Sequence, residues 1–299
     1  MGFEWEAGRY TESTCTLAVM ATLLALLSSA LWGTADYHGG KLSKSHPAIA
    51  VLGVTQAIGL IFGVSLAIIS GDLSAPAFGP DGYFIPGALA GILGYLGLIC
   101  LYAGLSTGRM GVVSPISGLS ALIPVAYAFF VKGDRLSIIL TIGAALAVVG
   151  AFLASGPEIS QGLPLKPLFL ALGAAGGFGT ALTFMAIGSE GSALMTMVMM
   201  RTTTLFVSIG IFAKYKTLGG LTFKHSPVLI FIGVADFLAN LLLGVATTKG
   251  NLTLAMVLGA LYPIFTALLA FQFLHERLHK VQYIGVAAAV AGVAIISAF

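Results

Sequence analysis

Trp32-Gly33-Thr34-Ala35 returns 146 residues later as Phe178-Gly179-Thr180-Ala181, and this repetition decides the fold. Further stretches return in the same order, at offsets between 139 and 146 residues: Leu119 to Pro124 as Leu258 to Pro263, Asp134-Arg135-Leu136 as Glu276-Arg277-Leu278, and Gly143 and Gly150 as Gly285 and Gly292. Similarity at a nearly constant spacing is the signature of an internal duplication. The chain therefore contains one unit twice.

Both copies consist of apolar segments of membrane length. Hydrophobic residues make up 58% of the chain and charged residues 8%, whereas a soluble domain has about 25% charged residues. Such segments cross a bilayer as helices, because a helix satisfies its own backbone hydrogen bonds. We therefore predict an all-α integral membrane protein. Its ten predicted transmembrane helices are 17–37, 48–70, 83–107, 111–131, 137–155, 167–188, 193–213, 227–247, 252–273 and 282–298.

These helices group into two repeats of five. We expect a short amino-terminal tail over 1–16, a first five-helix repeat over 17–155, a connecting loop over 156–166 and a second five-helix repeat over 167–299. Because five is odd, the second repeat must enter the membrane in the opposite direction. Inverted repeats of this kind build one site with two alternating openings in many secondary transporters.

Loop charges give a prediction for orientation. Nine Lys and Arg residues lie in the connections after the odd-numbered predicted helices, and four lie on the other side, tail included. Cytoplasmic loops carry the excess of positive charge, so the count places both termini outside the cytoplasm.

Two ionisable residues lie deep in predicted helices. Asp236 is near the middle of 227–247, with Asn240 one turn away on the same face, and Arg201 is inside 193–213. A charge at such a depth costs about 3 kcal/mol, so it faces a cavity or a partner. At 1.5 Å per residue, Arg201 and Asp236 lie about 12 and about 16 Å from the same membrane face, so they can pair. The pair either joins the two helices or takes part in binding substrate or a proton; Gln56 occupies the position of Arg201 in the first repeat.

Aromatic residues and prolines are further candidates. Trp32, Tyr95, Tyr102 and Tyr262 are aromatic residues within the predicted helices, suited to packing or to lining a cavity for an amphipathic solute. Pro124 and Pro263 lie at matching points of the two repeats, where proline bends a helix, and are candidate hinges. Asp36 and His38, at the end of the first predicted helix, are expected in a solvated or gate position.

Other functions find little support. No basic patch is interleaved with aromatic residues, so nucleic acid is not an expected partner, and no phosphate-binding loop indicates ATP. His275-Glu276-Arg277-Leu278-His279 matches a zinc metalloprotease motif, H-E-x-x-H, which needs a helix and a third ligand. It falls in a predicted turn, and its counterpart Gly133 to Ser137 has no histidine. We expect no catalytic residues, no metal and no cofactor.

The residues resemble a known transporter family. The likeness is carried by Leu31 to Asp36, Gly108 to Val113, Asp236 to Asn240, Leu261 to Pro263 and Glu276 to Leu278. Over essentially the whole chain they resemble the drug/metabolite transporter superfamily in its EamA-type ten-helix branch, to which amino-acid exporters such as YddG belong. The resemblance implies inverted repeats around a central cavity, export by alternating access, and both termini in the cytoplasm, opposite to the loop count.

The sequence thus leads to a hypothesis of a bacterial inner-membrane exporter of small organic metabolites, above all amino acids with apolar or aromatic side chains. Trp32, Tyr95, Tyr102 and Tyr262 would line the cavity. Asn240 and Asp236 would bind the amino group, and Arg201 would bind a carboxylate or hold Asp236. Protons are a further candidate partner, with Asp236 placed to carry one. The alternatives are an exporter of quaternary cations, drugs or nucleotide sugars, a membrane metalloprotease, and a scaffold that transports nothing.

Overall fold

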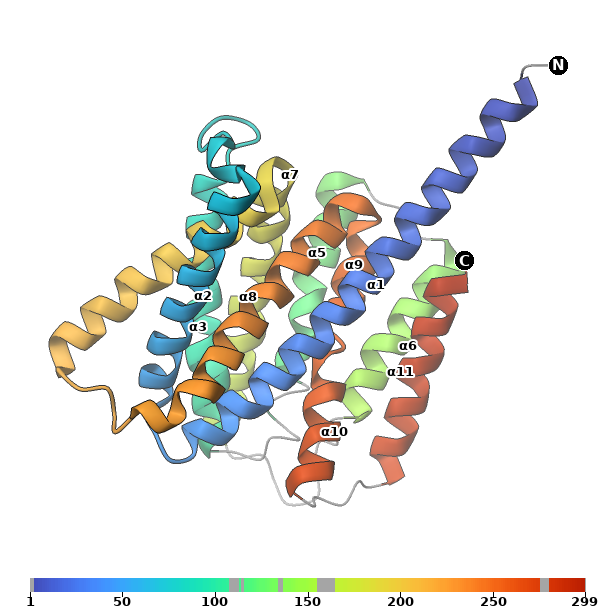
Figure 1. Cartoon of the computed structure of the whole chain (residues 1–299). Coiled ribbons are helices and arrows are strands. Elements are labelled where there is room, and N and C mark those ends of the chain that lie inside the picture. Colours follow the sequence, from blue (N-terminus) through green and yellow to red (C-terminus); the bar gives the residue numbers. More distant parts are fainter. Residues whose placement is uncertain are drawn as a thin grey trace.

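Helices form all the regular structure in the described part of the computed structural model, which covers residues 3–107, 113, 116–133, 137–154, 165–274 and 280–298 (Figure 1). The α-helices are α1 (Phe3–Ser43), α2 (Ala48–Ser70), α3 (Phe84–Thr107), α5 (Leu122–Tyr127), α6 (Ile138–Ala154), α7 (Leu165–Tyr215), α8 (Ser226–Lys249), α9 (Leu252–Gly259), α10 (Tyr262–Leu274) and α11 (Lys280–Ala298). The shorter elements are η1 (Asp72–Ser74), η2 (Leu119–Ala121), the π-helical η3 (Ala128–Lys132) and η5 (Phe223–His225).

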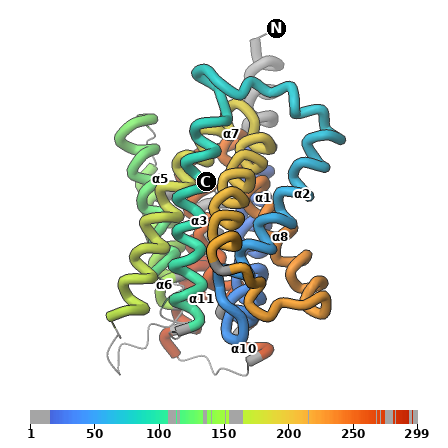
Figure 2. The backbone as a smooth tube through the Cα atoms, turned by 90° about the vertical axis from the view of Figure 1, so that its left-hand side faces the viewer, coloured from blue at the N-terminus to red at the C-terminus, as the bar shows by residue number. Residues whose placement is uncertain are grey.

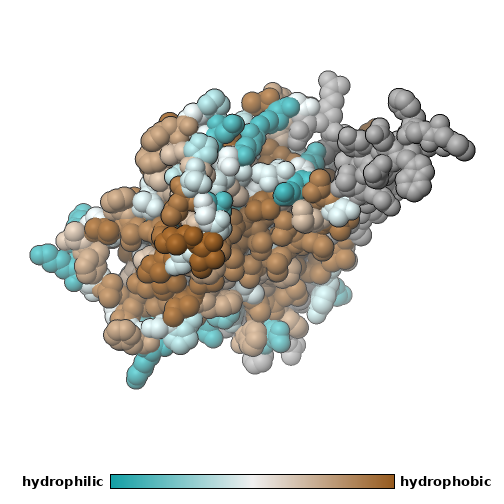
Figure 3. All heavy atoms as spheres, turned by 45° about the horizontal axis from the view of Figure 1, so that its top comes forward, coloured by the Kyte–Doolittle hydropathy of each residue, from teal (hydrophilic) through white to brown (hydrophobic). Residues whose placement is uncertain are grey.

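Many of these helices can cross a membrane. Six are long and apolar enough by length and composition: Thr16–Ser43, Ala48–Ser70, Phe84–Ser106, Leu165–Lys214, Phe223–Lys249 and Leu252–Phe273. Three shorter apolar helices accompany them: Ile116–Lys132, Thr141–Gly150 and Tyr283–Gly292. Large apolar side chains such as Ile69 and Phe130 are about 80% exposed, and Figure 3 shows apolar residues over much of the face in view, with hydrophilic residues at its margins. The chain is a multi-pass membrane protein.

The helix α7 is a hairpin whose two legs both contact α3. Ser192 has extended backbone angles (φ −157°, ψ 110°) inside α7 and breaks it into two legs. In the first leg, Gly173 lies against Cys100 and Gly177 against Gly97, so this leg runs antiparallel to α3. In the second leg, Met199 packs on Gly87 and Thr203 on Gly91, so this leg runs parallel to α3. The two legs therefore run in opposite directions, and Figure 2 shows them together beside α3.

Glycines bring several helices into backbone contact. A methyl group added to Gly177 would lie 2.8 Å from the carbonyl oxygen of Leu93. Between α6 and α11, a methyl group on Gly143 would lie 3.2 Å from the carbonyl oxygen of Gly292, and one on Gly150 would lie 2.8 Å from that of Gly285. Small residues permit this approach, which is how membrane helices gain dispersion contacts without a hydrophobic driving force.

The helix boundaries differ from the predicted ones in two informative places. Helix α1 begins at Phe3, within the predicted tail, and continues to Ser43, six residues past the predicted end at 37. The segment predicted as 252–273 is two helices, α9 and α10, separated at Ala260 and Leu261. Of the predicted loop 156–166, only the last two residues are described, and they belong to α7.

Candidate functional site

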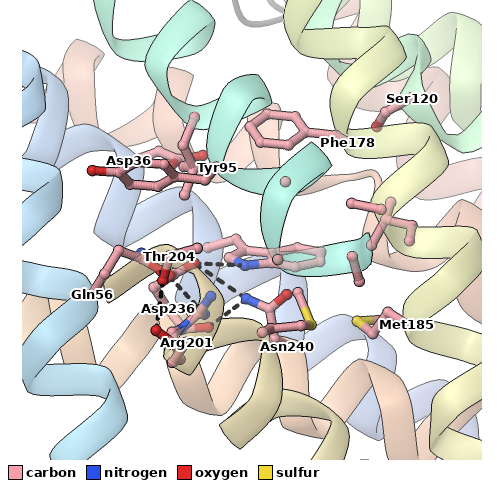
Figure 4. A pocket seen from close by; sticks show the side chains of 18 of the residues that line it. Asp36, Gln56, Tyr95, Ser120, Phe178, Met185, Arg201, Thr204, Asp236 and Asn240 are labelled. Carbon is pink, nitrogen blue, oxygen red and sulfur yellow. Dashed lines mark hydrogen bonds and ion pairs between the residues drawn. The ribbon is translucent and has the colours of Figure 1, made fainter. Parts of the chain in front are cut away.

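A cavity of about 70 Å³ lies among α1, α2, α3, η2, α7, α8 and α10 (Figure 4). Both repeats supply its lining. The lining residues are Trp32, Asp36, Gln56, Ala90, Gly91, Gly94, Tyr95, Leu98, Ser120, Phe178, Ala181, Leu182, Met185, Met200, Arg201, Thr204, Asp236, Asn240 and Tyr262. A space of this size holds several water molecules, and polar groups around it give them hydrogen-bond partners.

Asp236 is the centre of a hydrogen-bonded network at the cavity wall. Its Oδ2 accepts a hydrogen bond from Arg201 Nη2 at 2.8 Å and from Gln56 Nε2 at 3.2 Å. Its Oδ1 accepts from Trp32 Nε1 at 3.2 Å and from Asn240 Nδ2 at 3.3 Å. The Arg201 side chain is 3% exposed and that of Asp236 is 13% exposed. The charges are thus mutually neutralised, and the remaining lone pairs of the carboxylate are occupied, as a buried ion pair requires.

Helical spacing explains how the network assembles. Asn240 is one turn after Asp236 on α8, and its Nδ2 also donates to the Asp236 carbonyl oxygen at 2.7 Å. Thr204, one turn after Arg201 on α7, donates to Gln56 Oε1 at 3.3 Å. Gln56 therefore links α2 to α7 and α8 at once, through an acceptor and a donor on the same amide.

Aromatic rings form much of the remaining cavity wall. Trp32 meets Tyr262 edge to face, with ring centroids 6.2 Å apart. The hydroxyl groups of the two lining tyrosines, Tyr262 and Tyr95, form hydrogen bonds with serines. The oxygen–oxygen distance is 2.7 Å from Tyr262 to Ser117 and 2.8 Å from Tyr95 to Ser208. Hydrogen bonds at the tip of a ring fix its orientation, so these walls are preformed.

Most of the residues predicted for the site come together in this cavity. Six of them line it: Trp32, Tyr95, Arg201, Asp236, Asn240 and Tyr262. Tyr102 does not. It is 2% exposed, and a methyl group on Gly39 would clash with its ring, so it packs between α1 and α3 outside the lining.

Three of the lining residues that were absent from the predicted site are informative. Phe178 occupies the position of Trp32 in the second repeat, so the duplication itself could have indicated it. Gln56, likewise, matches Arg201 in the repeat. Asp36 was expected in a solvated or gate position, yet it is 8% exposed and lines the cavity. The reason is that α1 continues seven residues beyond it, to Ser43, which is about 10 Å of helix.

Pro124 and Pro263 each lie just after an irregular turn, at equivalent points of the two repeats. Pro124 is the third residue of α5 and follows the 3₁₀ turn η2, and Pro263 is the second residue of α10 and follows the break at Ala260 and Leu261. A proline in the first turn of a helix costs no hydrogen bond, because the amide there lacks a helical partner in any case. Each proline thus starts a helical segment just after an irregular turn. The hinge role stays a prediction.

The metalloprotease motif 275–279 and the charged turn 134–136 lie outside the described residues. Among the residues that are described, no three His, Cys, Asp or Glu side chains are grouped as a metal site would need.

Apolar helices around a cavity that holds buried charged side chains, in a multi-pass chain, are the features of a membrane transport protein. The sequence profile of the EamA-like transporter family matches residues 19–156 and again 165–298, so the chain belongs to this family. It is a membrane transporter built from two copies of one repeat, within the drug/metabolite transporter superfamily. A comparison with curated proteins finds no match. One solved structure, described only as a crystal structure of a protein, is 18% identical and has a TM-score of 0.74 over 92% of this chain and 95% of the other. This likeness concerns the fold.

Proposed function

We propose that the chain is an exporter of ten transmembrane helices in two inverted five-helix repeats, and that the cavity is the site where its solute binds. Pairs of contacts exchange under the repeat offset, as a two-fold relation requires, and the pair between α6 and α11 also supports the inversion. Gly143 against Gly292 becomes Gly285 against Gly150 at an offset of 142 residues, and both contacts occur. Residue numbers rise along α6 from Gly143 to Gly150 while they fall along α11 from Gly292 to Gly285, so these equivalent helices run antiparallel. Equivalent helices of opposite direction support opposite insertion of the two repeats.

The cavity supplies two further pairs of this kind. The hydrogen bond between Gln56 and Thr204 exchanges, at an offset of 145 residues, with the contact of Arg201 on Gly59. At the other wall, Gly33 packs against the start of α10, and Gly179 packs against η2 and the start of α5. The proposed two-fold axis would thus pass through the cavity, and both repeats would contribute equivalent positions to its wall.

The solute that fits best is a small amphipathic metabolite with an amino group, as in amino acids with apolar or aromatic side chains. Trp32, Tyr95, Phe178 and Tyr262 offer aromatic walls, and Asp36 offers a carboxylate. Alternating access would rest on the irregular turns ahead of Pro124 and Pro263, which let the halves of two helices change their angle. We place the protein in the bacterial inner membrane.

Counterflow into liposomes tests this proposal. Purified protein is expected to exchange labelled phenylalanine or another member of an amino-acid and amine panel. Leu182→Trp, which fills the cavity, should abolish exchange. Ile61→Trp adds the same bulk at a position that is 68% exposed on the lipid-facing surface, and should leave exchange intact. No exchange of any panel member, or equal effects of the two tryptophans, would contradict the proposed function.

A further inference from the structure

The charges that line the cavity do not balance. Two carboxylates, Asp36 and Asp236, face it, together with one guanidinium, that of Arg201. Arg201 forms its ion pair with Asp236, which also accepts the hydrogen bonds of Gln56, Trp32 and Asn240. Within the described residues, no hydrogen bond or ion pair involves the Asp36 carboxylate, and none of the dashed interactions in Figure 4 reaches it. Asp36 is nevertheless more than nine-tenths buried.

The surroundings of Asp36 do not compensate its charge. Asp236 of α8, Tyr102 of α3 and Tyr262 of α10 lie within electrostatic range of it, and none of them is a cation. On its own helix, His38 has Nδ1 within 2.8 Å of the Thr34 carbonyl oxygen. A buried carboxylate without a partner is costly in its ionised form, so a cationic group that entered the cavity would be stabilised beside Asp36.

We propose that Asp36 is the counter-ion for the positively charged group of the transported solute, so that the cavity selects organic amines of net charge +1 over zwitterions and anions. This inference rests on the proposed transport function and narrows its substrate class. Asp236 and Asn240, the residues that the sequence suggested for the amino group, belong to the structural network instead.

The rest of the lining fits a cationic amine. Trp32, Tyr95, Phe178 and Tyr262 present aromatic rings around the cavity, and ring faces attract cations. A zwitterion would also need a partner for its carboxylate, and Arg201 is poorly available for it. Its Nη2 binds Asp236 at 2.8 Å, and its Nε, which has no hydrogen-bond partner, lies near Gly59 of α2.

A series of ligands that share one ring system tests the proposal on the unaltered protein. Tryptamine (charge +1), tryptophan (zwitterion) and indole-3-propionate (charge −1) are compared as competitors of counterflow and as stabilisers in thermal unfolding. We expect tryptamine to bind about tenfold or more tightly than tryptophan, from one charge-assisted contact without an opposed carboxylate, and the propionate to bind least. Tryptophan binding as well as tryptamine would overturn the inference and leave the proposed transport function standing. Binding of none of the three, with no exchange of any panel member, would mean that the transport proposal itself fails.

Three variants test whether Asp36 is the residue responsible for this preference. Asp36→Asn keeps the size of the side chain and removes its charge, and it should bring the tryptamine-to-tryptophan affinity ratio down to about one. Asp81→Asn removes an acidic charge from an exposed position outside the cavity and should leave the ratio unchanged. Asp36→Glu, which restores the charge, should restore the preference and guards against a mere folding defect. A preference for tryptamine that survives in Asp36→Asn would overturn the assignment, even if that variant altered the pH dependence of transport.

Discussion

At the scale of single residues, Asp236 shows how a charge is kept inside a membrane protein. Four side chains from α1, α2, α7 and α8 donate to its two oxygens, so the carboxylate joins four helices. The net attraction within a buried ion pair is small. The larger effect would come from losing Asp236, because Arg201 would then remain buried and charged without a counter-charge.

Removing that carboxylate should therefore be strongly destabilising. We expect Asp236→Ala to lower the free energy of unfolding by about 3 kcal/mol or more, since Arg201 stays buried without a counter-charge. The double variant Arg201→Gln with Asp236→Asn should recover most of the loss. Unfolding in mixed micelles, followed by circular dichroism, measures both.

The surface pair of Lys132 and Glu190 is the control. Its side chains are 38% and 52% exposed, so Glu190→Gln should change the free energy of unfolding by no more than about 1 kcal/mol. If Glu190→Gln lowered the free energy of unfolding as much as Asp236→Ala, burial would not determine the cost of breaking an ion pair.

The sequence predicted this ion pair but not its partners. Depth along a helix follows from residue counting, which is why Arg201 and Asp236 could be matched. The hydrogen bonds of Trp32 and Gln56 depend on how α1 and α2 pack against α8, which no local pattern encodes. Asp36 was misplaced because Gly39 and Gly40 follow it, and the apolar pattern ends there although the helix does not.

At the scale of elements, the break at Ser192 turns one long helix into a hairpin. The Ser192 Oγ accepts a hydrogen bond from Met195 N at 3.1 Å, which is an N-cap for the second leg. Ser192→Ala should cost about 1 kcal/mol of stability, whereas Ser192→Asp should retain most of it. Thermal unfolding in detergent compares the three proteins; equal losses for both variants would show that the cap is not the cause.

Two adjacent glycines of the first leg give a sharper test of helix packing. Gly177 lies against the α3 backbone, whereas a methyl group on Gly176 would meet nothing within 4 Å. Gly177→Ala should separate the helices and destabilise the protein by about 1–3 kcal/mol. Gly176→Ala should be neutral or stabilising by up to about 1 kcal/mol, from helix propensity alone. Thermal unfolding in detergent distinguishes the two variants. An equal loss of stability in both would contradict the backbone contact between Gly177 and α3.

At the scale of the whole molecule, the duplication is what the sequence predicted best. The family profile matches the chain twice, at 19–156 and at 165–298, which confirms that one unit is present in two copies. A repeated motif can be recognised from the sequence alone, without knowing how the helices pack. At the break between α9 and α10 the sequence predicted only a bend, at Pro263. Apolar residues continue across the break, so composition does not show that one helix ends and another begins.

Orientation in the membrane gives the last prediction. The loops around Gly79 and Thr217 follow α2 and α7 at opposite ends of the bundle (Figure 1). If the excess of Lys and Arg marks the cytoplasmic side, then Gly79→Cys should react with a membrane-impermeant maleimide in intact cells, whereas Thr217→Cys should react only after lysis. Cys15 and Cys100 are replaced beforehand. The reverse labelling pattern would place both termini in the cytoplasm.

The glycine contacts between α6 and α11 bear on the history of the gene. Gly143 touches Gly292, and Gly150 touches Gly285, so each helix meets its own duplicate through corresponding positions. Two separate molecules of a half-length ancestor could have formed the same contacts with each other. A homodimer of such an ancestor would have held this junction before any fusion of the two copies, since a self-complementary surface needs only two copies of one unit.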